Sequence, residues 1–392
     1  MAKAQVVAGL EIGCTKLRMA VVENGGALTV YETACHDGVK NGMIINFDNI
    51  SESIIRLLED AARKKGVKAN SVFINISGLN ITQEVVSSVQ TLRERGCEIT
   101  RKNIDSLIES CKIISVPLDR HLLYLLPLEY IIDGQDSIKE PIGLCGSRLE
   151  AKVLIITAPF NQIQNITKVV NSAGLEAEDI ILSALANASS VLNMEEKKEG
   201  ILLIDFKTDL TDVSIFKDDS LIFFETISKG QRNVTEKIAA RFNIPHELAE
   251  GLKMKYGLLD IDAQDSRNRE TVPVEWMGAS QDILRGDLNK IINEQVGLIF
   301  DLIWERLKKA DNFNNMVKRG AVLTGGSTYM EGFLEGAHKK LRFAARLGNA
   351  NATATGLARY GYEKKLKNKI KPQAGLFRKV YQKADELLTE YF

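Results

Sequence analysis

Two segments far apart in the chain share one pattern, and this duplication constrains the fold more than any other feature. The first runs over 6–22 and the second over 201–216; each has an apolar strand, an acidic residue, a tight loop with Thr and Lys, and a second strand. Turn signals follow, Asn-Gly-Gly at 24–26 and Asp-Asp at 218–219. Asn-Gly between apolar runs is a strong hairpin signal. Two ordinary surface hairpins would show the same pattern, but the match favours a duplicated domain with two loops facing one ligand.

The two loops have the chemistry of a phosphate-binding site. A tight loop brings backbone N–H groups close to a phosphate, and a carboxylate beside it can hold a magnesium ion through water. Glu11 in the first segment and Asp205 in the second are candidates for that carboxylate. The pattern therefore predicts a nucleotide cleft between two halves of the protein.

The composition excludes several classes of protein. A chain of 392 residues is too long for one simple core, and 45% apolar with 26% charged residues is ordinary for a soluble globular protein. The formal net charge is zero, so no global field recruits nucleic acid. Four His without a Cys-x-x-Cys pair argue against zinc, and five scattered Cys indicate reduced thiols in the cytoplasm. No apolar run approaches the roughly 20 residues that span a bilayer. Residues 1–5 lead straight into a strand, without room for a signal peptide.

Apolar periodicity predicts alternating strands and helices around a small α/β insertion. Helices are expected at 50–65, 101–114, 162–172, 183–192, 233–242, 245–256, 280–310, 332–341 and 353–363. Besides the two hairpins, strands are expected at 71–77, 85–92, 122–132, 148–156, 178–182 and 320–324. A charged linker is expected at 195–199, and a loop or strand at 260–273.

These elements carry motifs in which the chain resembles the FtsA family of actin-like bacterial division proteins. The resemblance begins with the first loop and covers essentially the whole chain, in order. The further matching segments are DR at 119–120, LPLEYIIDGQ at 126–135, RLEAK at 148–152, TAP at 157–159, AGLE at 173–176, KMKYG at 253–257 and LTGGS at 323–327. The insertion is the most specific part, because actin and the heat-shock chaperone ATPases carry different insertions elsewhere.

The resemblance implies an α/β, actin-like fold of two lobes, each with a ribonuclease-H-like core, and a nucleotide between them. Subdomain IA would take 1–79, 153–195 and 341–362, and the insertion at 80–152 would be the FtsA-type subdomain IC. Subdomain IIA would take 196–228 and 286–340, and IIB 229–285. A linker at 363–375 and an amphipathic helix at 376–392 would follow.

The resemblance also implies partners and a place in the cell. In the family, IC makes contacts between protomers of a filament and with other division proteins. Subdomain IIB contributes adenine contacts and binds the tail of the tubulin homologue FtsZ. The implied cofactor is ATP or ADP with Mg²⁺. The implied location is cytoplasmic, on the inner face of the cell membrane at the division site.

The first loop departs from the family pattern, which usually reads Asp-Ile-Gly-Thr/Ser-Ser/Thr-Lys. Glu11 stands in place of the Asp, and its extra methylene would crowd or shift the water shell of a magnesium ion. Cys14 is a poorer hydrogen-bond partner than a hydroxyl. Gly13, Thr15 and Lys16 match the pattern.

The second loop departs further. The family usually carries three glycines between two Asp residues, because glycine allows positive φ and close backbone approach. Asp205 and Asp212 remain here, but Lys207, Thr208 and Asp209 replace the glycines. Their side chains would fill the space of a γ-phosphate. Asp209 would also set a carboxylate near phosphate oxygens, and like charges about 4 Å apart repel by roughly 1 kcal/mol even in water. Lys207 could offset that repulsion or stand in for a missing cation.

Further positions complete the candidate nucleotide site. The adenosine loop at 325–327 matches the family. At the start of the IIB helix stand Gly230, Glu236 and Lys237. The Glu-Lys pair, where usual members often have Asn-Asp, suits ribose and adenine contacts, although such pairs are also common on solvated helices. The candidate cofactor residues are Glu11, Gly13, Cys14, Thr15, Lys16, Asp205, Lys207, Thr208, Asp209, Thr211, Gly230, Glu236, Lys237, Gly325, Gly326 and Ser327. Three outcomes stay open: binding with slow or no hydrolysis, loss of binding, and an ordinary ATPase.

The carboxyl-terminal segment has the pattern of a helix at a membrane interface. Lysines at 364, 365, 367, 369 and 371 precede breaks at Pro372 and Gly375. One helical face then gathers apolar residues that suit the headgroup boundary; they include Leu376, Phe377, Val380, Leu387, Leu388, Tyr391 and Phe392. Lysines near an anionic leaflet add about 1 kcal/mol each. Acidic residues at 385, 386 and 390 oppose that attraction, and the alternative is a helix that docks on the protein itself or on a partner.

We therefore expect an actin-like adaptor that polymerises on the inner membrane and tethers FtsZ-type filaments through its terminal helix. One alternative is an ATPase whose turnover controls filament length; Asp205 and Asp212 favour it, and 207–209 oppose it. Another is an actin-like scaffold of a pilus or secretion assembly, a group that shares the IC-like insertion. A sugar kinase is not expected, because no second substrate-binding signature is present.

Overall fold

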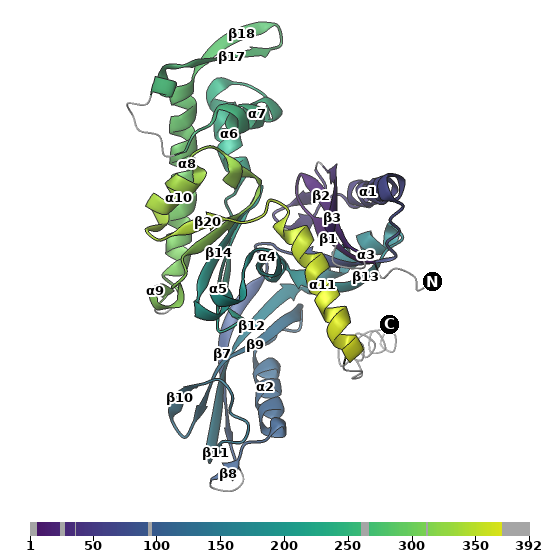
Figure 1. The fold of residues 1–392 in the computed structure, drawn as a ribbon, viewed down its shortest axis with the longest axis vertical. Helices are drawn as coiled ribbons and strands as arrows, with labels where there is room; N and C mark the ends of the chain where they lie inside the picture. Colours follow the sequence, from purple (N-terminus) through teal and green to yellow (C-terminus); the bar gives the residue numbers. More distant parts are fainter. Residues whose placement is uncertain are drawn as a thin grey trace.

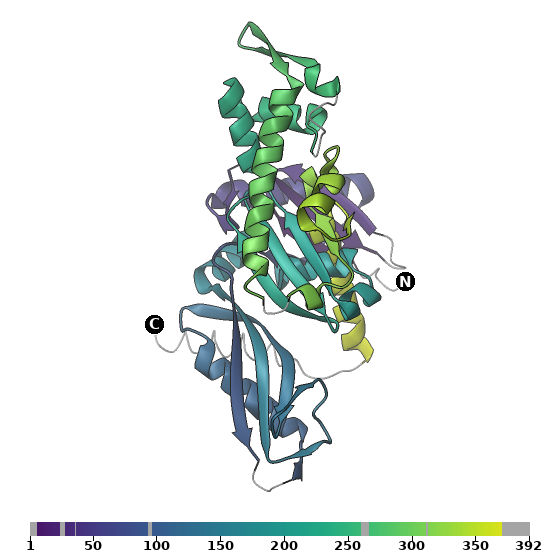
Figure 2. The ribbon, with the colours of Figure 1, turned by 90° about the vertical axis from the view of Figure 1, so that its left-hand side faces the viewer.

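The computed structural model describes residues 6–23, 28–35, 37–92, 96–259, 266–310 and 313–370. Two lobes lie side by side, and a smaller insertion extends from them (Figures 1 and 2). The expected turn at 24–26 and the expected amphipathic helix at 376–392 lie outside the described residues. Within the described residues, no helix is long and apolar enough to cross a bilayer.

Lobe I is built on a five-stranded sheet in the order β13-β6-β1-β2-β3. Its strands are β1 (Val7–Ile12), β2 (Lys16–Val22), β3 (Leu28–Ala34), β6 (Ser71–Ile76) and β13 (Glu176–Leu182). The first three form an antiparallel meander. Strand β6 runs parallel to β1, and β13 runs parallel to β6. A separate two-stranded ribbon follows, made of β4 (Val39–Lys40) and β5 (Met43–Ile44).

Lobe II repeats this arrangement with a sheet in the order β16-β15-β14-β19-β20. Its strands are β14 (Ile201–Phe206), β15 (Thr211–Lys217), β16 (Ser220–Ile227), β19 (Ala321–Thr324) and β20 (Ala345–Leu347). Three antiparallel strands are again followed by two parallel ones. The turn after β15 has positive φ at Asp218 (53°) and Asp219 (60°), as a tight two-residue hairpin requires. The matching strand order confirms the predicted duplication.

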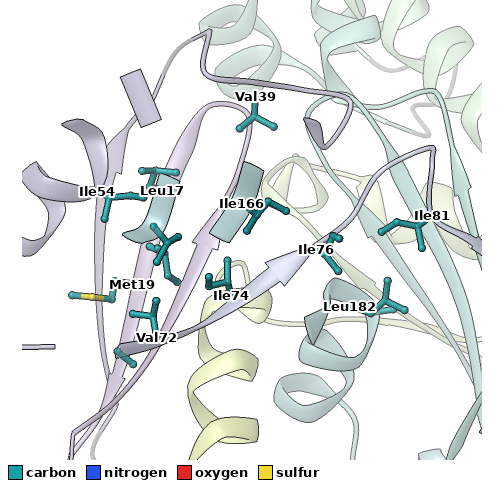
Figure 3. Close-up of a cluster of buried hydrophobic side chains, with 14 of the residues drawn as sticks. Leu17, Met19, Val39, Ile54, Val72, Ile74, Ile76, Ile81, Ile166 and Leu182 are labelled. Carbon is teal, nitrogen blue, oxygen red and sulfur yellow. The ribbon is translucent and has the colours of Figure 1, made fainter. Parts of the chain in front are cut away.

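Helices cover both faces of the lobe I sheet. They are α1 (Phe47–Lys65), α3 (Phe160–Ser172), α4 (Ser183–Val191) and α11 (Ala352–Ile370). Because side chains alternate along a strand, Val72 and Ile74 of β6 pack with Ile54 of α1 and Ile166 of α3 (Figure 3). Phe73, between them, packs on the opposite face against α11. Each such buried side chain contributes about 1.5–3 kcal/mol.

Lobe II carries its own core and an upper part, which lies at the top of the view in Figure 1. Its helices include α5 (Met194–Glu199), α8 (Arg285–Leu307), α9 (Phe313–Met316), α10 (Phe333–Leu341) and the 3-10 turn η2 (Gly326–Tyr329). The upper part holds α6 (Gln231–Phe242), α7 (His246–Tyr256), the 3-10 turn η1 (Ser266–Arg269), and the hairpin of β17 (Thr271–Trp276) and β18 (Ala279–Leu284). The apolar stripe of α8 faces the lobe II sheet.

The insertion is a four-stranded sheet in the order β10-β9-β12-β7, with one helix packed on it (Figure 1). Its elements are β7 (Thr82–Thr91), β8 (Cys97–Glu98), α2 (Arg101–Ser115), β9 (Arg120–Ile132), β10 (Gln135–Ile138), β11 (Cys145–Gly146) and β12 (Arg148–Pro159). It has a separate small core. Strand β12 runs without a break into α3, which anchors the insertion to lobe I.

Three local predictions are wrong. The helix expected at 280–310 begins at Arg285, and 279–284 is strand β18, which turns back on β17 through Met277 and Gly278, both with positive φ. The charged linker expected at 195–199 is helix α5, because Asn193 and Glu196 form a reciprocal capping box.

The third wrong prediction concerns the segment after residue 363, which was expected to be a linker. Helix α11 continues to Ile370. Lys364 pairs with Asp179, and Lys365 pairs with Glu178 at 2.6 Å. These ion pairs hold the first lysines of the basic stretch against β13, the edge strand of the lobe I sheet.

Candidate functional site

The two matched loops meet at one cavity between the lobes. Its volume is about 840 Å³, within the range of small-ligand sites. Lobe I contributes the loop between β1 and β2 together with Asn75 and Ser77 at the end of β6. Lobe II contributes 205–210, the loop at 325–327, and residues of α6 and α7. Two unrelated surface hairpins would not converge in this way.

Most of the predicted cofactor residues line this cavity. They are Glu11, Gly13, Cys14, Thr15, Lys16, Asp205, Lys207, Thr208, Asp209, Gly325, Gly326 and Ser327. Thr211 is buried instead, and its hydroxyl donates to the carbonyl of Lys229 at 2.8 Å. Glu236 and Lys237 lie exposed on α6 outside the lining, which is the arrangement of a solvated helical pair.

Gly230 lies outside the lining but shapes the second loop. A Cβ at this position would lie 2.5 Å from the carbonyl oxygen of Thr208, so the close approach requires glycine. The N–H of Gln231 donates to the carbonyl of Lys207 at 3.0 Å. The N–H of Arg232 donates to the carbonyl of Thr208 at 2.7 Å. The start of α6 therefore fixes the backbone of the loop that replaces the three glycines.

In the first loop, Glu11 is held by the neighbouring strand. Its carboxylate lies 3.3 Å from the Arg18 guanidinium, and the two residues are register partners on β1 and β2. Burial raises the pKa of Glu11, and Arg18 opposes that rise. The carboxylate that was expected beside a magnesium ion is thus engaged by an arginine.

The rest of the first loop is a tight turn. The N–H of Gly13 donates to the carbonyl of Lys16 at 3.2 Å. The Lys16 ammonium lies 2.8 Å from Glu32, and both side chains are about half exposed, at 46% and 50%. Burial raises the pKa of the Cys14 thiol to about 12, with a further rise from the carboxylate of Asp209. Cys14 therefore stays protonated, and Lys16 stays accessible from solvent.

In the second loop, the side chain of Lys207 points back toward Asp205 and Asp212. Its Nζ contacts Asp212 Oδ2 and lies 3.7 Å from Asp205 Oδ2. It also donates to Ser77 Oγ of lobe I at 2.6 Å. Burial disfavours the ammonium, but Asp212 and Asp205 outweigh it, so the pKa of Lys207 is raised and the side chain is charged.

Both aspartates are also fully engaged by neutral donors. Asp205 accepts from Asn187 Nδ2 at 2.9 Å and from Thr324 Oγ1 at 3.0 Å. Asp212 accepts from Thr226 Oγ1 at 2.9 Å and from Ser77 Oγ at 3.2 Å. In the described residues no group of three or more His, Cys, Asp or Glu side chains is placed to hold a metal. In this arrangement Glu11 and Asp205 do not fit a hydrated magnesium ion.

Asp209, which was expected to face phosphate oxygens, is neutralised by a residue of α6. Its Oδ1 lies 2.6 Å from Nε of Arg232. Its Oδ2 accepts from the backbone N–H of Asn41, in lobe I, at 3.2 Å. The Asp209 side chain is 6% exposed. The second loop thus contacts lobe I through both Lys207 and Asp209.

The cavity is also lined by a glycine turn and by two residues with unpartnered buried nitrogens. Gly325 has a φ of 111°, and a Cβ there would lie 2.1 Å from the carbonyl oxygen of Phe206, so this turn requires glycine. Gln231 is 6% exposed, and its Nε2 has no hydrogen-bond partner in the described structure. The same holds for the buried Nε2 of His246. Unpartnered buried nitrogens that line a cavity favour a polar ligand.

Sequence reasoning missed the lining residues of α6 and α7. They are Gln231, Arg232, His246, Glu247, Glu250 and Met254. Positions 247, 250 and 254 lie on one face of a helix, so helical spacing could have grouped them. The pairing of Arg232 with Asp209 had no local signal, because the two residues are 23 positions apart.

Comparisons with known proteins agree with this geometry. A family model described as "SHS2 domain inserted in FTSA" matches residues 78–157, which is the insertion. A model described as "Cell division protein FtsA" matches residues 202–362, which form most of lobe II and the start of α11.

Several curated relatives carry the name cell division protein FtsA. The one from Pseudomonas aeruginosa is 31% identical over 88% of this chain and 83% of that protein. The one from Borreliella burgdorferi is 29% identical over 93% of each chain. The one from Escherichia coli K12 is 28% identical over 92% of this chain and 87% of its own.

Solved structures show the same fold at low sequence identity. A PilM-PilN type IV pilus biogenesis complex gives a TM-score of 0.63 at 16% identity, over 91% of this chain and 98% of that one. The MreB5 protein of Spiroplasma citri bound to ADP gives 0.59 at 11% identity, over 93% and 98%. These neighbours show an actin-like fold. The family models and the curated relatives, which match over most of the chain, establish that this chain belongs to the FtsA family of actin-like cell division proteins.

Proposed function

We propose that this chain is a membrane-bound adaptor, which forms filaments on the inner face of the cell membrane and tethers FtsZ-type filaments there. The observation that carries the proposal is the relationship to FtsA proteins over most of the chain, including the inserted domain. Family membership gives the role in cell division. Filament formation, membrane contact and the FtsZ-type partner are the parts that experiments must test.

The insertion supports filament formation. Strand β7 lies at the edge of its sheet, and among the described strands none pairs with its outer side. Val85 and Val89 lie on one face of this strand and are 55% and 50% exposed. An edge strand with exposed apolar side chains suits contact with a second protomer.

The sequence pattern at 376–392 supports the membrane contact, and liposome co-sedimentation tests it. We expect the full chain to pellet with anionic liposomes and a chain ending at Gly375 to stay in the supernatant. Leu387→Glu should weaken pelleting because it places a charge on the apolar face. Gln382→Ala on the opposite face is the matched control and should pellet like the full chain. Unchanged pelleting of the shortened chain would contradict the tether.

The FtsZ-type partner can be tested on the same liposomes. An FtsZ-type filament should sediment with liposomes only when the full chain is present. The upper part of lobe II, 229–285, is the expected contact by analogy with the family. Recruitment that survives removal of 376–392 would show that the partner reaches the membrane without this chain.

The second part of the proposal is that the cleft binds an adenine nucleotide and hydrolyses it slowly or not at all. The size of the cavity, the glycine turn at Gly325 and the unpartnered Nε2 of Gln231 support binding. Slow turnover is expected because Lys207 engages Asp205 and Asp212, the two residues that favour the ATPase alternative. Calorimetry with ATP and ADP, beside phosphate release, tests both statements. Rapid release would favour the ATPase alternative, and lack of binding would contradict the nucleotide cleft.

A further inference from the structure

Two carboxylates face each other directly behind the second loop. Asp205 on β14 and Asp212 on β15 are partners in the antiparallel register, and both are buried. Like charges about 4 Å apart repel by roughly 1 kcal/mol in water and more strongly in a cleft. The pair therefore needs a cation to remain ionised in the folded protein.

Lys207 supplies that cation from within the loop. Its Nζ faces the Oδ2 atoms of both Asp205 and Asp212. Ser77 Oγ accepts a hydrogen bond from the same nitrogen and donates one to Asp212. The ammonium is thus surrounded by oxygen atoms from both lobes, which is the kind of environment that a hard cation prefers.

The backbone fixes this position of Lys207. Its N–H donates to the carbonyl of Leu210 at 2.9 Å, and its carbonyl accepts from Gln231 on α6 at 3.0 Å. None of the residues at 207–209 has a positive φ. The loop therefore holds the lysine in ordinary backbone geometry.

A divalent cation does not fit beside this ammonium. Mg²⁺ requires near-octahedral oxygen ligands at about 2.0–2.1 Å and keeps several waters. The Lys207 ammonium already lies at the aspartate oxygens that would face such a shell. In lobe I, the matched acidic residue Glu11 is paired with Arg18. Each acidic position behind the two loops is thus paired with a cation of the chain itself.

We propose that Lys207 is a built-in counter-ion that replaces a divalent metal in this cleft, so that neither the fold nor ligand binding depends on Mg²⁺. The inference rests on the nucleotide cleft of the proposed function for its second part only. Its first part concerns the protein alone. Removing the lysine should create a dependence on metal that the natural chain does not have.

The first test uses the metal alone. Thermal unfolding of the full chain is measured in MgCl₂ and in NaCl of equal ionic strength, with Lys207→Ala beside the natural sequence. The natural chain should unfold at the same temperature in both salts. In NaCl, Lys207→Ala should unfold at a temperature at least roughly 2–4 °C below that of the natural chain. MgCl₂ should restore at least half of that loss, because a small side chain leaves room for the ion.

Two further variants keep this test decisive. Lys229→Ala removes an exposed lysine from the neighbouring turn. Its unfolding temperature should be the same in MgCl₂ and in NaCl. If Lys207→Ala does not fold, Lys207→Ser offers a small polar side chain in the same space. Mg²⁺ stabilisation of the natural chain equal to that of the variant would overturn the proposal. So would a folded variant that gains nothing from MgCl₂.

The second test uses a fluorescent ADP analogue, titrated in MgCl₂ and in EDTA. The natural chain should bind the analogue with affinities in MgCl₂ and in EDTA that differ by less than twofold. Lys207→Ala should bind it at least tenfold more weakly in EDTA than in MgCl₂. A natural chain that needs Mg²⁺ for binding would overturn the metal-independent ligand site. If no nucleotide binds under either condition, the nucleotide part of the proposed function fails together with the second part of this inference, and the thermal test alone decides the first part.

Discussion

The two lobes have the same sheet topology but neutralise their loops in different ways. In lobe I the acidic residue Glu11 is paired with its register partner Arg18 on the adjacent strand. In lobe II the matched register holds two acids, Asp205 and Asp212, and the cation comes from Lys207 in the loop itself. The apolar strand interiors maintain the duplicated fold. A few polar positions at the strand ends decide what each loop can bind.

The loops also differ in how their backbones make room for a ligand. Gly13 is required in the first loop, because a Cβ there would lie 2.7 Å from the carbonyl oxygen of Lys16. The second loop has no glycine at 207–209, and its residues need none, since their φ values are negative. In lobe II the position that requires glycine is Gly230 instead, where the start of α6 packs against the carbonyl of Thr208 in the loop. The second loop therefore lines the cavity without a glycine at 207–209.

The largest expected effect comes from breaking the lobe I pair. Arg18→Ala leaves the Glu11 carboxylate partly buried without its partner, and removal of one member of a buried pair typically costs about 3 kcal/mol or more. Urea unfolding should show this loss. The double variant Arg18→Ala, Glu11→Gln should recover much of it, because the stranded charge is gone. Arg63→Ala, which removes an exposed pair with Asp60, is the control and should cost less than about 1 kcal/mol. Equal losses of unfolding free energy for Arg18→Ala and Arg63→Ala would show that the pairing of Glu11 with Arg18 contributes no more than an exposed ion pair.

The next largest effect concerns the close contact between Gly230 and the backbone of the second loop. Gly230→Ala should destabilise the chain by about 2 kcal/mol, because the new methyl group would overlap the carbonyl of Thr208. It should also weaken nucleotide binding, since the second loop would shift. Gly251→Ala on α7 is the matched control: no atom lies within 4 Å of a Cβ there, and a helical alanine is favoured over glycine. A tolerated Gly230→Ala would show that the loop does not depend on α6.

A smaller effect is a dependence of stability on pH that arises in lobe I. Burial raises the pKa of Glu11 in the folded chain above its ordinary value of 4.5. The folded chain therefore binds a proton there more readily than the unfolded chain. Stability from this site is full below the ordinary pKa and is lost as the pH rises through the raised value. On acidification from neutral pH, the natural chain should gain stability relative to Glu11→Gln in urea unfolding. A constant difference between the two chains would show that Glu11 does not titrate abnormally.

Local patterns explain which parts of the fold could be predicted from the sequence. The hairpins of both lobes have strand, loop and turn within a few residues, so their periodicity and turn signals sufficed. The strand at 279–284 was assigned to a helix because Ile283 and Leu284 continue the apolar stripe of the helix that follows. Nothing in the spacing reveals that Met277 and Gly278 turn the chain back on β17.

In the candidate site, too, local features could be predicted from the sequence, whereas contacts between distant segments could not. The sequence placed both loops in one cleft and identified Lys207 as a possible substitute for a cation. It could not give the direction of that side chain, because Ser77, its partner in lobe I, lies 130 residues away. For the same reason the pairing of Asp209 with Arg232 was not predicted, and Asp209 was expected to repel a phosphate. Contacts between distant segments, rather than residue types, decide the electrostatics of this cleft.

The smallest expected effect on stability comes from Lys16→Ala. This variant gives the sharpest test of how the loops of the two lobes differ. The ammonium of Lys16 pairs with Glu32 at 2.8 Å, but both side chains are about half exposed, and such pairs contribute about 0–1 kcal/mol. Lys16→Ala should therefore change the unfolding free energy by less than about 1 kcal/mol. Because Lys16 can turn from Glu32 toward the cavity that it lines, its loss should weaken nucleotide binding by about tenfold, the effect of one charge-assisted hydrogen bond.

Lys207→Ala should show the opposite balance, with a greater loss of stability than Lys16→Ala and, in MgCl₂, a smaller loss of affinity. The two variants thus separate a cation that is available to a ligand from one that is committed to the protein. Lys229→Ala again serves as the control for removal of an exposed lysine. If Lys16→Ala binds nucleotide like the natural chain while Lys207→Ala does not, the roles of the two loops are reversed. Lys207 would then contact the phosphates directly, and its pairing with Asp205 and Asp212 would have to open when the ligand binds.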